Sequence, residues 1–311
     1  MRGPNLLELP QPPRGKKGWP WTEETPQLTE TMPDGQPWPR VSIVTPSYNQ
    51  GRFIEETIRS VLLQGYPNME YIIVDGGSTD NSVEIIKRYE KWLTYWVSEP
   101  DRGQSEAINK GFGKASGEIY TWLNSDDYLL ENALQNIVMA YHISPKAGAW
   151  CGGCLLVDAN DKKLRVHWPN RFDADGIADT SQNYFMQPAC FFSEKAWQKC
   201  GPLDEGLHFT MDFDLWLKMA KLTSFEKVPI ILAAAHIHRD SKIGRGEAHF
   251  KTEQVLVQIR HGYVNFAIRD IARWMKEYDE LMRKVGRISR FPLFRPIIPI
   301  ARIIWGKLNY I

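Results

Sequence analysis

Acidic side chains stand at points of this sequence where short apolar runs end. Asp126 and Asp127 follow the run Glu118–Leu123. Two adjacent carboxylates repel each other unless a cation or hydrogen-bond donors compensate their charge. Carboxylate oxygens suit Mg²⁺ or Mn²⁺, ions that commonly bind one or two carboxylates together with the phosphates of a substrate. The pair therefore predicts a divalent metal site, with a cap for a helix from about Glu131 as the structural alternative.

The elements that would carry such residues alternate between strand and helix from Val41 onward. β-branched or continuously apolar runs predict strands, and apolar residues at helical spacing follow them. This order predicts an α/β fold with a mostly parallel sheet, covered by helices on both faces. The predicted strands are 41–45, 71–74, 94–98 and 118–123, and the helices between them lie near 53–62, 81–91 and 107–115.

Polar residues follow all four predicted strands, which is hard to explain by helix capping alone. They are 47–50, 75–80, 101–102 and 124–127. Because ligands bind beyond the carboxyl ends of parallel strands, these residues predict one ligand site. The sequence has no Gly-x-x-x-x-Gly-Lys-Ser/Thr loop, and no Gly-x-Gly-x-x-Gly follows the first strand. Both absences count against a P-loop NTPase and a dinucleotide oxidoreductase.

The composition is that of an ordinary globular protein. The chain has 311 residues, 43% of them apolar, and a net charge of +1. Without a strongly basic field, a nucleic-acid partner is not expected. Neither a secretory signal nor a membrane-spanning apolar run is apparent, so we expect a cytoplasmic protein. Four cysteines are too few for a disulfide scaffold, and Cys151 and Cys154 are interpreted as buried strand residues rather than a metal or redox site.

The two ends of the chain differ from its middle in composition. We therefore expect three parts, residues 1–40, 41–243 and 244–311. The first holds nine of the 20 prolines and three tryptophans, which predicts an extended segment lying across a folded surface. Residues 248–284 are expected to be helical. From Arg283 onward seven Lys or Arg residues are mixed with Phe, Ile and Trp, without any acid. This mixture favours peripheral contact with an anionic membrane, with packing on the core as the alternative.

An ordered series of motifs between about 41 and 243 resembles the family 2 glycosyltransferases, whose catalytic domain has the Rossmann-like GT-A fold. The resemblance implies an inverting hexosyltransferase that moves a sugar from a nucleoside diphosphate, UDP by default, to an acceptor hydroxyl. It also implies an acceptor glycan or lipid-linked sugar, in the synthesis of a cell-envelope polysaccharide or glycolipid. The motifs are Val41–Asn49, Ile73–Asp80, Asp101–Gly111, Leu123–Asp127, Gly201–Asp204, Met211–Leu217 and His236–Lys242.

The same resemblance implies roles for individual residues. Asp126 is placed as the Mn²⁺ or Mg²⁺ ligand and Asp127 as its support, although Asn124 replaces the usual first acid of the Asp-x-Asp motif. Asp212 is placed as the general base, although Met211 replaces the acid that commonly precedes it. Asp214 is the substitute for this role. The structural alternative is that Asp212 only caps a helix. The resemblance also implies contacts to the donor: Asp75 and Tyr48 would contact the nucleobase, and Asn124 the ribose. Ser47, Arg102 and Lys110 would contact the diphosphate or the base. His238 would be a further metal ligand, with His236 as the alternative.

Two other functions fit parts of this pattern. A nucleotidyltransferase uses a similar metal and diphosphate site, but it would need a basic glycine-rich loop where Pro46–Asn49 stands. A non-catalytic sugar-nucleotide binder is conceivable because of Asn124 and Met211. The presence of Asp126, Asp127 and Asp212 counts against that second function.

Overall fold

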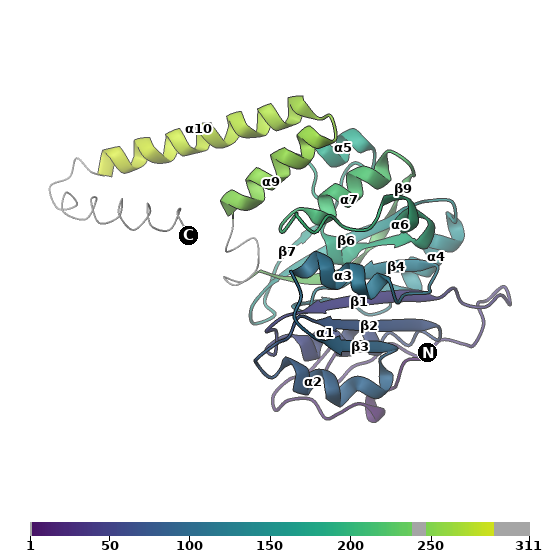
Figure 1. Cartoon of the computed structure of the whole chain (residues 1–311). Coiled ribbons are helices and arrows are strands. Elements are labelled where there is room, and N and C mark those ends of the chain that lie inside the picture. The colour runs from purple at the N-terminus through teal and green to yellow at the C-terminus, as the bar shows by residue number, and fades with distance from the viewer. Residues whose placement is uncertain (1, 238–246, 289–311) are drawn as a thin grey trace. The chain divides into compact units, whose positions relative to one another are not determined.

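The computed structural model describes residues 2–237 and 247–288 of the chain (Figure 1). The chain divides into two compact units, Met1–Val257 and Gln258–Ile311. The first unit contains the sheet, and the second contains the long helix α10. None of the helices in the described ranges has the length and apolar composition needed to cross a membrane.

The described strands of the first unit form one nine-stranded sheet in the order β3-β2-β1-β4-β8-β6-β9-β5, with β7 paired to β6. The strands β3, β2, β1 and β4 run parallel, as their apolar runs predict. Beyond β4 the sheet is mixed: β6 and β9 are parallel, whereas β8, β5 and β7 run antiparallel to their neighbours. The strands are β1 Val41–Ser47, β2 Met69–Asp75, β3 Tyr95–Ser98, β4 Ile119–Trp122, β5 Asp127–Leu129, β6 Ala149–Asp158, β7 Lys163–His167, β8 Cys190–Ser193 and β9 Phe225–Ile237.

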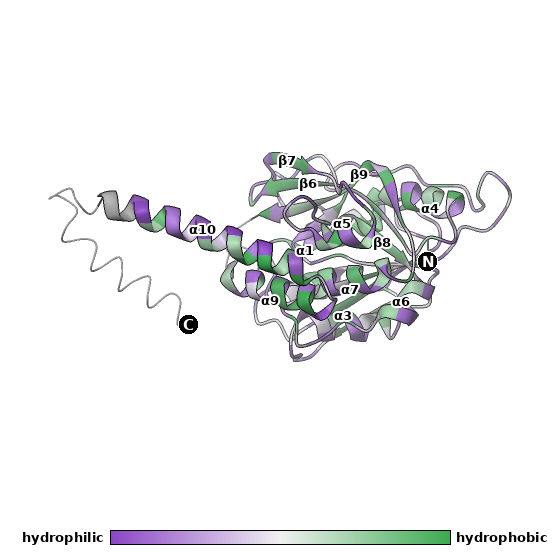
Figure 2. Ribbon diagram, turned by 90° about the horizontal axis from the view of Figure 1, so that it is seen from above, coloured by the Kyte–Doolittle hydropathy of each residue, from purple (hydrophilic) through white to green (hydrophobic). Residues whose placement is uncertain are grey.

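The helices begin and end close to the predicted positions, and 248–284 is helical except around 261–263. Hydrophilic and hydrophobic residues alternate along α10 (Figure 2), as in an amphipathic helix. The helices are α1 Ile54–Leu62, α2 Ser82–Tyr89, α3 Gln104–Phe112, α4 Ala133–Ile143, α5 Ala174–Ala178, α6 Glu194–Cys200, α7 Met211–Ala220, α9 Glu247–Arg260 and α10 Val264–Ile288, with short 3-10 helices at Leu6–Glu8, Glu90–Trp92 and Gln187–Ala189.

The two faces of the sheet carry different cores. Alternate residues of β1, such as Ile43, join a large apolar cluster with α1, α2 and α4. The opposite face is aromatic: Trp122 of β4 stacks on Trp216 of α7, with ring centroids 5.8 Å apart. On this face α3 lies so close to β1 that a Cβ at Gly111 would stand 2.4 Å from a methyl group of Val44. The predicted two-sided covering of the sheet is therefore confirmed.

The proline-rich N-terminal segment packs against the first unit, as its tryptophans predict. Trp21 and Trp38 are buried, each with 4% of its surface exposed. The fully buried guanidinium of Arg59 in α1 donates hydrogen bonds to three carbonyl oxygens of the segment, those of Pro10, Pro20 and Trp21. These bonds occupy backbone acceptors that a proline-rich chain cannot satisfy in a regular element.

All four cysteines are buried free thiols. Cys151 and Cys154 belong to β6, and Cys190 of β8 lies directly opposite Cys151. The interpretation of the CxxC spacing as buried strand residues is therefore confirmed.

Candidate functional site

A cleft of about 950 Å³ opens where the parallel strands β1, β2 and β4 end. Its volume is in the range of cavities that bury a ligand of nucleotide size. All four stretches predicted to gather at this edge contribute to its lining, with Ser47, Tyr48, Gly76, Asp101, Arg102, Asn124, Asp126 and Asp127 among the residues. Gln104, Asp212 and His236 also line it.

The two adjacent acids differ in burial and surroundings. Asp126 lies half-buried at the cleft, whereas Asp127 is buried at the start of β5. Burial, followed by the charge of Asp126, raises the pKa of Asp127 well above its usual value. The Asp127 carboxylate accepts hydrogen bonds from Asn124 Nδ2 at 3.1 Å and from the backbone nitrogen of His236 at 3.2 Å. This geometry suits Asp126 as a ligand for a hard cation and Asp127 as its support.

The departure from the usual motif at Asn124 has a structural reason. Its amide donates to Asp127 and its oxygen accepts a hydrogen bond from Gln104 Nε2. A carboxylate at this position would have no proton to donate, and it would set a third acid against Asp126 and Asp127. Asn124 therefore satisfies Asp127 without adding negative charge.

Of the two residues implied to bind the nucleobase, Tyr48 lines the cleft, whereas Asp75 is buried next to the lining residue Gly76. The Asp75 carboxylate is fully buried and accepts hydrogen bonds from Ser78 Oγ at 2.6 Å and Ser98 Oγ at 2.7 Å. Its neighbour Gly76 lines the cleft, whereas Asp75 itself is not among the lining residues. Tyr48 is 61% exposed at the cleft, which leaves its ring accessible to a planar ligand.

Ser47 ends β1 with a polar atom that is not satisfied. Its hydroxyl oxygen is buried and has no hydrogen-bond partner among the described residues, although the residue lines the cleft. Buried polar atoms are almost always paired, so this hydroxyl is available to a ligand that enters the cleft if its side chain turns toward it. This observation supports the implied role of Ser47.

The two predicted basic contacts are placed differently. Arg102 lines the cleft and forms ion pairs with Glu106 and Glu205 at 2.9 and 2.6 Å. Lys110 of α3 instead forms an ion pair with Glu99 at 2.6 Å. It is not among the residues that line the cleft. The structure thus brings Arg102, but not Lys110, to the ligand site.

Asp212 and Asp214 both lie in the first turn of α7, but they point to different surroundings. Asp212 lines the cleft, half-buried. Asp214 is buried with 1% of its surface exposed and pairs with Lys218 at 2.7 Å. The geometry therefore favours Asp212 over its substitute as the residue that faces a substrate.

The start of α7 is held by a residue that sequence reasoning missed. Glu253 of α9 accepts hydrogen bonds from the backbone nitrogens of His208, Phe209 and Thr210, at 2.8 to 3.1 Å. A carboxylate at a helix start satisfies orphan amide groups and complements the helix dipole. No local pattern indicates this cap, because Glu253 stands more than 40 residues further along the chain.

His236 faces the acid pair from β9. Its Nδ1 lies 2.5 Å from the carbonyl oxygen of Asp126, and its Nε2 lies 2.8 Å from Asp161 Oδ1. Both partners offer hydrogen-bond acceptors, an arrangement that favours the doubly protonated, positively charged ring. Burial disfavours this charge, but the hydrogen bonds to Asp161 and to the Asp126 carbonyl raise the pKa of His236 above its usual value. Both ring nitrogens thus already have protein partners. His238, the other metal candidate, lies outside the described residues.

The sheet order and the cleft together define an α/β protein of the GT-A type, in which acids at the carboxyl ends of parallel strands face one ligand site. Residues 42–197, half of the chain, match the family described as Glycosyl transferase family 2. The chain belongs to this family.

Curated relatives are similar over part of their length. An uncharacterized glycosyltransferase of Rickettsia typhi is 28% identical over 206 residues, 64% of this chain and 64% of that protein. A second one, from Haemophilus influenzae, is 35% identical over 137 residues, 40% of this chain and 55% of that protein. The chain thus spans less than two thirds of the length of these relatives.

Solved structures share the fold. Residues 1–349 of S. aureus TarS, in complex with UDP-GlcNAc, match with a TM-score of 0.55 and 15% identity, over 83% of this chain and 78% of that one. The mannosyltransferase PcManGT from Pyrobaculum calidifontis, in complex with GDP-Man and Mn²⁺, matches with a TM-score of 0.52 and 18% identity, over 90% of this chain and 86% of that one.

Proposed function

We propose that this protein transfers a hexosyl group from a nucleoside diphosphate sugar to an acceptor hydroxyl, with inversion and with the help of Mn²⁺ or Mg²⁺. The observation that carries the proposal is the shared cleft, in which Asp126 and Asp212 both line one space of nucleotide-sugar size. A binding site for a free nucleotide would not need a second carboxylate at the start of a helix on the opposite wall. The family match supports the same activity.

The donor would lie along the cleft with its base toward Tyr48 and its diphosphate toward Asp126. A divalent ion held by Asp126 would neutralise the charge that develops on the departing diphosphate. Arg102 and the unsatisfied hydroxyl of Ser47 offer further contacts to phosphate or base. The buried carboxylate of Asp75 would fix the loop around Gly76 against which the base rests.

The acceptor hydroxyl would approach from the wall formed by α7. Asp212 would take the proton of that hydroxyl as the new bond forms at the anomeric carbon. The helix dipole at the start of α7 favours the ionised carboxylate, so Asp212 is ready to accept a proton when the acceptor oxygen becomes acidic.

The first experiment is a thermal-shift titration with UDP, GDP, dTDP and CMP, each with and without Mn²⁺. A ligand that binds the folded state raises the melting temperature according to its affinity. We expect a shift with one nucleotide that requires Mn²⁺ and is absent in Asp126→Asn. No shift with any nucleotide would contradict the proposal, and a shift without transfer to any acceptor would favour a non-catalytic binder. TarS was solved with UDP-GlcNAc and PcManGT with GDP-Man, so these sugars come first in the transfer assay.

We further propose that the acceptor is a lipid-linked sugar or glycan of the cell envelope, reached by peripheral contact with an anionic membrane. In α10, Ile268, Ile271, Met275 and Tyr278 are exposed, and seven basic residues follow from Arg283 onward. Such a mixture of apolar and basic residues binds anionic interfaces. The full-length chain should float with anionic liposomes, and a chain truncated at Gly286 should not. Equal flotation of both chains would refute the contact.

A further inference from the structure

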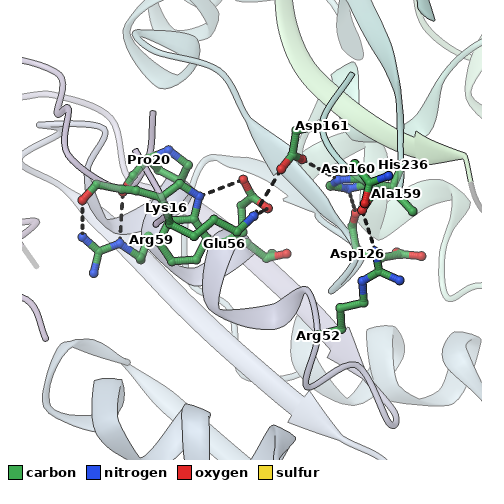
Figure 3. A network of polar contacts seen from close by, with 12 residues as sticks. Lys16, Pro20, Arg52, Glu56, Arg59, Asp126, Ala159, Asn160, Asp161 and His236 are labelled. Atoms are coloured by element: carbon green, nitrogen blue, oxygen red, sulfur yellow. Dashed lines mark hydrogen bonds and ion pairs between the residues drawn. The ribbon is translucent and has the colours of Figure 1, made fainter. Parts of the chain in front are cut away.

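A second group of charged residues lies beside the acid pair, and of its members only His236 also lines the cleft. Glu56 of α1, Asp161 of the turn between β6 and β7, and His236 of β9 place one ligand atom each within 4.8 Å of one another. The ammonium group of Lys16 stands beside them, 3.7 Å from Glu56 Oε2 and 3.2 Å from Asp161 Oδ2 (Figure 3). Lys16 therefore places a positive charge beside both carboxylates.

Lys16 is held in this place by the N-terminal segment. Its ammonium group also lies 5.0 Å from the centre of the Trp21 ring, and Trp21 Nε1 donates to Glu56 Oε1 at 3.1 Å. Arg59 fastens the backbone on both sides of Lys16, at Pro10 and at Pro20. The segment is thus anchored at several points around one charged side chain (Figure 3).

Asp161 links Lys16 to His236, which in turn contacts Asp126. One carboxylate oxygen of Asp161 binds Lys16 and the other binds His236 Nε2. Its backbone has a φ of 61°, a conformation that glycine adopts most easily and that Asp and Asn tolerate better than other residues. The hydrogen bond from His236 holds the pKa of Asp161 below its usual value. A second cation, Arg52, binds the same turn at the carbonyl oxygen of Ala159, at 2.7 Å.

His236 and α1 then hold the main chain of the acid pair. His236 binds the carbonyl oxygen of Asp126 through its ring and the carboxylate of Asp127 through its backbone nitrogen. Thr57, which follows Glu56 in α1, donates to the carbonyl oxygen of Asp127 at 2.7 Å. The main chain that carries the Asp126 carboxylate is therefore held by contacts that begin at Lys16.

We propose that Lys16 is a positioning residue for the metal site: a tethered cation that, through Asp161 and His236, fixes the direction of the Asp126 carboxylate. The proposal rests on the proposed function. It makes the N-terminal segment part of the catalytic apparatus, although no residue of the segment lines the cleft. Partners that orient metal ligands typically change metal affinity by about 10–100-fold when they are removed.

The test replaces Lys16 with Met, which keeps the apolar stem over Trp21 and removes the charge. Lys16→Met should raise the Mn²⁺ concentration for half-maximal nucleotide binding about tenfold or more. It should lower kcat and leave the KM for the donor unchanged at saturating Mn²⁺.

Lys16→Arg should restore most of the affinity, and Lys17→Met, at the exposed neighbouring lysine, should have no effect. Asp161→Asn should act like Lys16→Met, and the double variant should be no worse than either single one.

A second measurement needs neither metal nor nucleotide. In Lys16→Met, backbone amides of 124–129 and 158–163 should exchange hydrogen faster, whereas those of α4 should not change. Unchanged exchange and unchanged Mn²⁺ affinity would overturn the proposal. So would a second equivalent of metal bound by the native chain and lost in Glu56→Gln, because a metal ion would then be the cation of the cluster. If the native chain binds no nucleotide, the proposed function fails, while the exchange measurement still decides whether Lys16 fixes the acid pair.

Discussion

At the scale of single residues, α7 places the two carboxylates of its first turn in different surroundings. Asp212 lines the cleft and Asp214 is buried against Lys218, although they stand two positions apart in the first turn of one helix. Their replacement by Asn should therefore affect two different properties. Loss of the cleft residue removes a proton acceptor, and loss of the buried one leaves a charged partner without its counter-ion.

We predict that Asp212→Asn lowers the transfer rate by about 10²–10⁴-fold and leaves metal-dependent donor binding intact, because the amide cannot accept the acceptor proton. The measurement is single-turnover transfer together with the thermal shift. The matched control is Asp214→Asn, which should lower the melting temperature and keep transfer per folded molecule. Near-native turnover in Asp212→Asn would remove Asp212 from the general-base role.

The buried thiols give a prediction that depends on pH. Burial raises the pKa of Cys154, Cys190 and Cys200 above the usual thiol value. At pH 8 the folded protein should react slowly with an aromatic disulfide reagent, and four thiols should react after denaturation. Because the unfolded chain loses these protons first, the free energy of unfolding should fall as the pH rises past about 8.5. Rapid labelling of Cys151 or Cys154 in the folded state would revive a redox role for the CxxC spacing.

At the scale of elements, the parallel half of the sheet is predictable because each strand and its following helix are neighbours in the sequence. Continuous apolar runs and helical spacing identify β1, β2, β3 and β4 without any distant contact. The partners of β9 are distant in the sequence, 76–79 positions away in β6 and 104–108 positions away in β5, and no local pattern indicates these pairings. The same holds within the site. Motif positions indicate Asp126 and Asp212. No motif marks Glu253 or Lys16, which contact Thr210 and Asp161 from segments distant in the sequence.

The close approach of α3 to β1 can be tested at Gly111. A side chain there would overlap the methyl groups of Val44, which is itself fully buried in β1. Gly111→Val should lower the free energy of unfolding by about 1–3 kcal/mol. It should also weaken nucleotide binding, because Gln104 at the start of α3 holds Asn124 in the cleft. Gly113→Ala, at a position with ordinary helical backbone, is the control and should not lower stability. Both effects are read from urea unfolding and nucleotide titration.

At the scale of the whole molecule, the N-terminal segment is part of the core of the first unit. Leu9 has 4% of its surface exposed and lies in the main apolar cluster, whereas Leu7 is 92% exposed. The segment therefore contributes to stability through a few buried side chains, and substitutions at its exposed residues should leave the free energy of unfolding nearly unchanged.

This difference gives a matched pair of variants. Leu9→Ala should lower the free energy of unfolding by about 2–5 kcal/mol. Leu7→Ala should change it by less than about 0.5 kcal/mol. Chemical denaturation of both variants under the same conditions checks the prediction. Equal, small effects would mean that the segment is peripheral to the fold.

The anchoring of Lys16 has a consequence for how the chain is made. Lys16 and Asp161 are 145 positions apart, so ribosomes working at about 5–20 residues per second need roughly 7–30 s to produce the second partner after the first. During that time Trp21 and the backbone around it have left the ribosome, while the turn that completes their site has not. The contact between Lys16 and Asp161 therefore forms only after the segment around Lys16 has been translated. A nascent chain stalled before residue 161 should offer these tryptophans to chaperones.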